Sequence, residues 1–281
     1  MRSFFEAISV SCVIPAQSPA DDERTVFENL SFAVERGEIV DLVGPSGSGK
    51  SSLLTACARL NPHAHGAFAL EGKGSGEFTP QQWRRDVAYL PQKPILTGKN
   101  VAEAIRLPWT LAIRGKGGKG EHLLPDERIR TTLDAMGCED IDLERAPHDL
   151  SGGQTARVAL ARTLLTDPKV LLADEVDAGL DDDNAAKVAT IMADAAAHGM
   201  AIIRIRHRPP DGRATRTLTL DKGRLTEREM TDSAAQDANA VPDGADENEE
   251  TQAIWAIPTT SISGVCSSRW AWWPWRPSSA N

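Results

Sequence analysis

The stretch from residue 39 to residue 51 reads I-V-D-L-V-G-P-S-G-S-G-K-S and decides the fold of this 281-residue chain. Its first five residues have the β-branched, apolar character of a buried strand. Gly44 to Ser51 then fit the pattern G-x-x-x-x-G-K-[S/T], and a segment suited to a helix continues to Leu60. In such a loop successive backbone N–H groups point at phosphate oxygens, and the helix N-terminus adds partial positive charge. The stretch therefore predicts a phosphate-binding α/β fold of the P-loop type.

The loop also supplies candidate ligands for a nucleoside triphosphate. Lys50 is expected to bridge the β- and γ-phosphates of ATP, and the Ser51 hydroxyl to hold Mg²⁺. The predicted nucleotide-binding residues are Gly44, Pro45, Ser46, Gly47, Ser48, Gly49, Lys50, Ser51 and Ser52. The pattern alone is shared by kinases, GTPases and other P-loop enzymes, so it does not choose among them.

An apolar run, V-L-L-A at residues 170–173, leads directly into Asp174 and Glu175. Asp174 can reach the Mg²⁺ shell, which leaves Glu175 to polarise an attacking water. An acidic pair at a strand end could also be ordinary surface charge. The apolar run before it and the phosphate loop elsewhere in the chain favour the catalytic interpretation.

Further segments place this site in a larger sheet. Strands are expected at residues 7–11, 26–34, 66–72, 86–90, 169–173 and 201–205, and helices at residues 51–60 and 184–198. Residues 101–165 are mainly helical in character. Because strands that alternate with helices are typical of parallel sheets, we predict an α/β core that carries a helical insertion.

Charge and composition exclude several classes of function. The formal charge is −9, but residues 232–250 contain seven acids and no base, so the rest of the chain is close to neutral. Broad binding to nucleic acid or to anionic membranes is therefore not expected. No stretch reaches the roughly 18–20 apolar residues that span a bilayer. The four scattered cysteines predict reduced thiols rather than a metal site or disulfides.

The stretch Leu150-Ser151-Gly152-Gly153-Gln154 opens another apolar-periodic segment. A serine and two glycines at a helix start make a second anion site, with exposed amides, a hydroxyl and the positive end of the helix dipole. Ser151 could also be only an N-cap. An N-cap explains neither both glycines nor the glutamine, so Ser151, Gly152, Gly153 and Gln154 are predicted to form a second anion site, which the family resemblance given next makes a nucleotide-binding site.

With this motif the chain resembles the ATP-binding subunits of ABC transporters, whose signature is L-S-G-G-Q, over about residues 5–228. The resemblance implies a P-loop core of parallel sheet and flanking helices, an N-terminal antiparallel β-subdomain and a helical signature subdomain at about residues 93–167. Residues 1–230 would then form the ATP-binding domain. Residues 231–281 form an acidic, then Trp-rich tail, which we expect to be disordered.

The resemblance also assigns roles to residues outside the phosphate loop. Gln92, in Y-L-P-Q at residues 89–92, would contact Mg²⁺ or the attacking water, and His207 would contact the γ-phosphate. Residues 178–181 resemble the segment that crosses the dimer interface, called the D-loop. The predicted catalytic residues are Glu175, His207 and Gln92, and the predicted metal ligands are Ser51, Gln92 and Asp174.

Some positions depart from the family pattern. No aromatic residue stands between Val10 and Val26, where the side chain that stacks on adenine is expected. Arg206 precedes His207 in place of the usual Thr, Arg208 follows it in place of Asp, and Asp177 stands where Ser or Thr is common. These departures remove no catalytic group, but they favour slow turnover.

The function implied is that of a transporter motor. Two chains would bind two ATP molecules head to tail as a homodimer, on the cytoplasmic face of the cell membrane, and would drive a separate permease. I-R-L-P-W at residues 105–109 resembles a bacterial branch associated with metal or iron export. The alternative is a soluble ABC-type ATPase of DNA repair or translation. The single cassette, the absence of heptads before residue 150 and the absence of zinc-binding cysteine pairs disfavour it.

Overall fold

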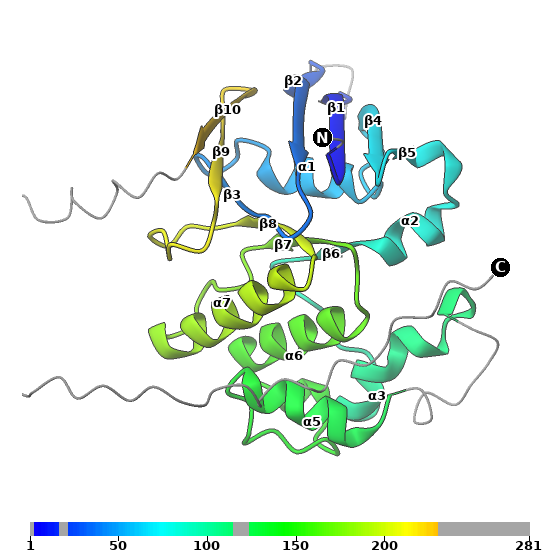
Figure 1. Ribbon diagram of the computed structural model, residues 1–281, viewed down its shortest axis with the longest axis vertical. Helices are drawn as coiled ribbons and strands as arrows, with labels where there is room; N and C mark the ends of the chain where they lie inside the picture. Colours follow the sequence, from blue (N-terminus) through cyan, green and yellow to red (C-terminus); the bar gives the residue numbers. More distant parts are fainter. Residues whose placement is uncertain (1–2, 17–21, 115–123, 230–281) are drawn as a thin grey trace, which may run out of the picture. The chain divides into compact units, whose positions relative to one another are not determined.

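Two β-sheets organise the chain in a computed structural model, which describes residues 3–16, 22–114 and 124–229 (Figure 1). The first sheet is antiparallel, in the order β2-β1-β4-β5, and the second has the order β10-β9-β3-β8-β7-β6. The strands are β1 Phe5–Ile14, β2 Arg24–Val34, β3 Ile39–Val43, β4 Ala64–Leu70, β5 Lys73–Gly74, β6 Val87–Leu90, β7 Val170–Asp174, β8 Ala201–Ile205, β9 Arg216–Asp221 and β10 Arg224–Glu229. The predicted α/β architecture, with an N-terminal antiparallel sheet, is confirmed.

Six α-helices and four 3₁₀ turns accompany the sheets within the described ranges. The helices are α1 Lys50–Cys57, α2 Pro80–Asp86, α3 Val101–Arg106, α5 Asp126–Ala135, α6 Gly152–Leu165 and α7 Asp182–Ala197. The 3₁₀ turns are η1 Ser75–Glu77, η2 Leu107–Thr110, η3 Ala112–Arg114 and η4 Pro147–Asp149. The chain separates into units at residues 1–235 and 236–281, and every described residue belongs to the first. The predicted tail lies outside the described residues.

The parallel strands carry apolar side chains on both faces and separate two cores. In β7, Val170 and Leu172 pack on one side, while Leu171 and Ala173 pack on the other, as expected when successive side chains alternate. The first core lies between this sheet, α1 and the antiparallel sheet. The second is closed by α3, α5, α6 and α7. Burial on both faces explains why β7 begins with the continuous apolar run V-L-L-A.

Parallel pairing brings the strand ends that carry polar residues to one edge of the sheet. Strands β3, β8, β7 and β6 are mutually parallel neighbours, with Asp174 opposite Ile205 and Ala173 opposite Leu90. The loops that follow these four strands therefore leave from the same edge. Such an edge is where open α/β sheets bind their ligands.

Two regions differ from the sequence prediction. The segment at residues 101–165 is only partly α-helical, because α3 ends at Arg106 and Pro108 lies in a 3₁₀ turn, where its missing N–H costs no helical hydrogen bond. Strands β9 and β10 were not predicted. The described cysteines, Cys12, Cys57 and Cys138, are buried and free, and Cys266 lies outside the described residues.

Candidate active site

The glycine-rich loop occupies residues 44–49, between β3 and α1. Gly44 has φ 143° and Gly49 has φ 100°, both in the region that favours glycine. A Cβ at Gly44 would lie 2.1 Å from the carbonyl oxygen of Leu220, and one at Gly49 would lie 2.5 Å from Cγ1 of Val26. The curvature of the loop therefore requires these two glycines.

Lys50 begins α1 and is buried, with 6% of its surface exposed. Its Nζ donates to the carbonyl oxygens of Gly44 and Pro45, at 2.9 Å each. The ammonium group is thus held against its own loop, where phosphate oxygens could replace these acceptors. Of the other predicted nucleotide ligands in the loop and the first turn of α1, Pro45, Ser46, Gly47 and Ser51 are exposed, and Gly44, Ser48, Gly49 and Ser52 are partly buried.

Asp174 ends β7 and is 4% exposed. Its Oδ2 accepts a hydrogen bond from the Tyr89 hydroxyl at 3.0 Å, whereas its Oδ1 is buried without a partner. Burial, and next the Asp174 carboxylate, raise the pKa of Tyr89, so Tyr89 remains a donor. A buried carboxylate oxygen without a donor suits a bound cation. The donor set of Asp174 and the exposed Ser51 hydroxyl therefore fits Mg²⁺.

Glu175 lies between the other two predicted catalytic side chains. Its Oε2 accepts a hydrogen bond from Nε2 of Gln92 at 2.6 Å, and its Oε1 lies 2.8 Å from Nε2 of His207. The three residues follow β7, β6 and β8, so the common sheet edge explains their meeting. The side chain of Glu175 is 19% exposed and that of His207 is 51% exposed. A carboxylate held between two donors and partly exposed to solvent can accept a proton from water.

The predicted second anion site caps α6. Ser151 Oγ accepts from the backbone N–H of Gln154 at 3.2 Å, and Gln154 Oε1 accepts from the backbone N–H of Ser151 at 3.0 Å. This reciprocal pair is a capping box, so Gln154 also has a structural role, which was not predicted from the sequence. Gly152 has no such role, because a Cβ there would meet nothing within 4 Å.

A pocket of about 460 Å³ adjoins the phosphate loop. It is lined by Arg24, Thr25, Val26, Phe27, Glu28, Gly47, Ser48, Lys222, Gly223 and Arg224. Phe27 is only 1% exposed, so the lining offers basic side chains rather than an aromatic face. The missing aromatic residue thus leaves a basic, open space beside the phosphate loop.

Residues 27–178 match the family model described as ABC transporter. The chain belongs to this family of ATP-binding cassettes. As an ABC ATP-binding subunit it is an ATPase, and the matched residues contain the P-loop, the L-S-G-G-Q motif and the acidic strand end described above, in that order along the chain. No helix of the cassette within the described ranges is long and apolar enough to cross a membrane.

Curated relatives of the cassette carry names from both directions of transport. It is 35% identical over 219 residues to the hemin import ATP-binding protein HmuV of Nocardia farcinica, covering 76% of this chain and 73% of that one. It is 34% identical to the methionine import ATP-binding protein MetN 1 of Pseudomonas fluorescens, covering 62% of this chain but only 52% of that one. It is also 33% identical to the "Probable iron export ATP-binding protein FetA" of Escherichia coli, covering 58% and 68%.

Solved structures share the fold of the cassette. The bacterial ABC transporter cassette MJ0796, in a dimeric structure, matches with a TM-score of 0.70 at 23% identity, over 80% of this chain and 98% of that one. An ATP-binding subunit of an ABC transporter matches with a TM-score of 0.67 at 24% identity, over 84% and 94%. At these identities the likeness shows the fold alone.

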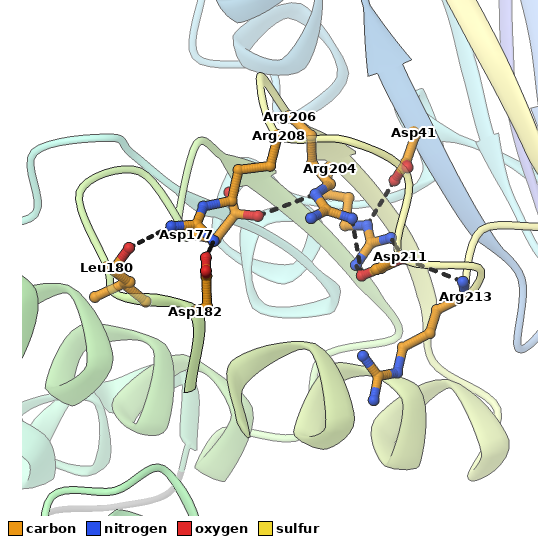
Figure 2. A network of polar contacts seen from close by, with 9 residues as sticks. All are labelled: Asp41, Asp177, Leu180, Asp182, Arg204, Arg206, Arg208, Asp211 and Arg213. Atoms are coloured by element: carbon orange, nitrogen blue, oxygen red, sulfur yellow. Dashed lines mark hydrogen bonds and ion pairs between the residues drawn. The ribbon is translucent and has the colours of Figure 1, made fainter. Parts of the chain in front are cut away.

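Two features of the site were not predicted from the sequence. Tyr89 was given no role, although its phenol is the hydrogen-bond donor to Asp174. Asp177 and Arg206 were two separate departures from the family pattern, although Arg206 Nε donates to Asp177 Oδ2 at 3.0 Å in the structure (Figure 2). Two departures of opposite charge at buried positions were a signal that could have suggested the pair.

Proposed function

We propose that this chain is the ATP-hydrolysing motor of an ABC transporter, acting as a homodimer on a separate membrane permease. Residues 1–230 would form the cassette, with a helical subdomain at about 93–167. One observation carries the catalytic part of the proposal, namely the Glu175 carboxylate held between Gln92 and His207. That arrangement is suited to activating one water molecule at the edge of the sheet.

The reaction would proceed by attack of that water on the γ-phosphorus of ATP. Glu175 takes the proton as the new P–O bond forms, and the bond to the bridging oxygen of ADP breaks. Lys50 and His207 would donate to γ-phosphate oxygens, and Gln92 would orient the water. Ser51, Gln92 and Asp174 would hold Mg²⁺, which supplies charge neutralisation at the phosphate oxygens when it is bound.

The signature residues support a dimer. Ser151 is the N-cap of α6, and Gly152 and Gly153 occupy the first turn, where backbone N–H groups have no acceptor within the helix. Gly152 has open space where a side chain would stand, so its surface can approach another molecule closely. We propose that this surface contacts the γ-phosphate bound by a second copy, which makes each site incomplete in a single chain.

A groove on the cassette supports contact with a permease. It has a volume of about 600 Å³ and is lined by Ala58, Leu60, Gln81, Arg84, Arg85, Val87, Ala88, Tyr89, Pro108, Leu111, Ala112, Ile113, Arg162, Thr163 and Thr166. Leu60 and Leu111 expose 45% and 53% of their surfaces there. Tyr89 links the groove to Asp174, so an occupant would lie one side chain from the proposed metal ligand. A permease loop with apolar and acidic residues fits this lining.

The proposal places the cassette at the cytoplasmic face of the cell membrane, attached through the permease. We favour a metal, such as iron, as the cargo and export as the direction. The resemblance of I-R-L-P-W at residues 105–109 and the relative named for iron export both point to this function. Two other relatives are named for import, which is the opposite direction. The experiment must therefore also test the direction of transport.

The test is purification of the tagged full-length chain from native membranes in mild detergent. We expect a multi-span permease in comparable amount, and we expect Leu111→Asp to release it while ATP hydrolysis by the purified chain persists. Ile8→Asp is the control, because Ile8 is exposed on β1 and does not line the groove. Recovery of the chain with ribosomes or DNA-repair proteins instead would support the soluble alternative. Transport assays with metal-loaded vesicles of the purified complex would then decide cargo and direction.

A further inference from the structure

Three arginines alternate along and beyond β8, at positions 204, 206 and 208 (Figure 2). Arg204 lies in β8 and Arg206 follows the strand, and both guanidinium groups lie against the Asp211 carboxylate, at 2.7 and 2.8 Å. The side chains of Arg204 and Arg206 are 1% and 7% exposed, which is unusual for arginine. Burial of this kind requires specific partners.

Arg204 is anchored on both sides. Its Nε donates to Asp41 Oδ1 at 2.6 Å, and its two Nη atoms donate to the carboxylate of Asp211 at 2.9 and 2.7 Å. Asp41 lies directly opposite Arg204 on the neighbouring strand β3. Burial raises the pKa of Asp211, but the hydrogen bonds and charge of Arg204 outweigh it, and the net pKa is lowered. Asp211 is therefore a fixed negative charge beside the next arginine.

Arg206 connects two loops of the active site. Its Nε donates to Asp177 Oδ2 at 3.0 Å, with both side chains less than 10% exposed. Its Nη1 lies 2.8 Å from Asp211 Oδ2, although outside hydrogen-bond geometry. Asp177 is two residues after Glu175, and Arg206 is one residue before His207. The ion pair thus connects the segment that follows Glu175 to the segment that carries His207.

Arg208 repeats the connection on the far side of His207. It donates to the carbonyl oxygen of Leu180 and, at 2.9 Å, to Oδ1 of Asp182. Both acceptors belong to the D-loop and its continuation into α7. Figure 2 shows Arg206 bound to Asp177, and Arg208 bound to Leu180 and Asp182. The residues before and after His207 are therefore bound to the segment that follows Glu175.

His207 itself lacks other restraints of this strength. Its side chain is 51% exposed, and its Nε2 lies 2.8 Å from Oε1 of Glu175. A half-exposed imidazole is not held by packing, so its position depends on the backbone that carries it. That backbone is fixed by the two arginines on either side.

We propose that Arg206–Asp177, together with Arg208 on Leu180 and Asp182, forms a clamp that positions His207 against Glu175 within one chain. The proposal rests on the catalytic roles given above to Glu175 and His207. Arg206, Arg208 and Asp177 are positioning residues and touch no substrate. The two departures from the family pattern at positions 177 and 206 compensate each other, since each supplies the charge that the other needs at a buried position.

A purely structural role for the ion pair would predict effects on stability alone. The double variant Asp177→Asn/Arg206→Met separates the two roles, because it removes both charges and keeps most of the volume, leaving no unpaired buried charge. In the full-length chain with ATP and Mg²⁺ we expect the thermal midpoint to stay near that of the wild type. We expect kcat to fall about fivefold or more while KM changes less than about twofold.

Arg206→Lys tests the clamp with the charge near Asp177 retained. This variant should keep a large part of the wild-type kcat that the double variant loses. Arg208→Met keeps the proposal testable if the double variant does not fold. The Arg208 side chain is 30% exposed, so its loss should be tolerated by the fold. It should lower kcat by about threefold to tenfold with little change in KM. Arg213→Met is the matched control, because the Arg213 side chain bonds Thr190 on α7 and leaves the clamp intact.

Wild-type kcat in a folded double variant and in Arg208→Met would overturn the clamp. Equal losses in Arg208→Met and Arg213→Met would also overturn it, because the effect would then be general. Glu175→Gln is measured alongside. If it retains turnover, the catalytic assignment fails, and if it alone loses turnover, only the clamp fails.

Discussion

Glu175 adopts a left-handed backbone conformation with φ 51°, which is uncommon for a residue that carries a side chain of this length. The residue comes directly after β7, where the chain must turn while Asp174 still faces the sheet edge. The turn directs the Glu175 carboxylate to Gln92 and His207. Such local strain is retained where the surroundings fix it, and the hydrogen bonds on both carboxylate oxygens supply that restraint.

Glu175→Gln should abolish most turnover while leaving nucleotide binding intact. The amide keeps the size of the carboxylate but cannot take a proton from water, so kcat should fall by about 10²- to 10⁴-fold. Steady-state phosphate release measures this loss, and fluorescence of a labelled nucleotide measures binding. Glu127→Gln, which removes an exposed acid in the first turn of α5, is the control. A Glu175→Gln chain that still hydrolyses ATP at the wild-type rate would exclude Glu175 as the base.

Single residues differ in how far sequence could assign them. The phosphate loop was predictable because its geometry is encoded locally, in glycines and a lysine at fixed spacing. The contact of Arg206 with Asp177 joins positions 29 residues apart, so no local pattern contains it. Gln154 shows the opposite error, because a residue assigned to ligand binding also completes a local cap.

Helix α2 illustrates how an element depends on one side chain. Trp83 is fully buried, donates its Nε1–H to the carbonyl oxygen of Cys57 at 2.9 Å and packs against Phe5, Phe68 and Phe78 at ring-centroid distances of 5.5 to 6.5 Å. It thereby joins α2 to α1 and to the antiparallel sheet. The helix is short, so its stability comes from this packing and from the Thr79 capping box rather than from helical propensity.

Trp83→Ala should lower the free energy of unfolding by about 3–5 kcal/mol, because it leaves a cavity and an unsatisfied carbonyl group. Denaturant titration followed by circular dichroism measures the change. Leu111→Ala, at a side chain that is 53% exposed, should change stability by no more than about 0.5 kcal/mol. A change of that small size in Trp83→Ala would show that α2 does not depend on the aromatic cluster.

Elements with continuous apolar runs were predictable, and elements with mixed composition were not. Strand β7 was predicted at residues 169–173 and lies at Val170–Asp174, because burial on both faces leaves the apolar run V-L-L-A. Strand β9 alternates, with only Leu218 and Leu220 facing the core, and β10 is exposed along most of its length. The signal for a hairpin in the sequence was Gly223, which has φ 74° in the turn between the two strands.

At the scale of the whole molecule, ATP should bring two copies together when hydrolysis is blocked. We expect the mass of the Glu175→Gln chain, measured by light scattering, to double on addition of ATP and Mg²⁺. Adding Gly152→Glu to that chain should keep it monomeric through like-charge repulsion with phosphate, without unfolding it, because a Cβ at Gly152 meets no atom within 4 Å. Persistent monomer in Glu175→Gln, together with full ATPase activity in the wild type, would contradict the dimer.

Lys50 in this structure is already tethered to two carbonyl oxygens of the loop that it serves. These two hydrogen bonds restrain the curved backbone between Gly44 and Lys50. A nucleotide then exchanges one set of acceptors for another, and little conformational entropy is lost in ordering main chain at that moment. In a flexible loop, part of the free energy of nucleotide binding would be spent on ordering the backbone. Here that part is available for larger rearrangements, such as bringing two distant surfaces together.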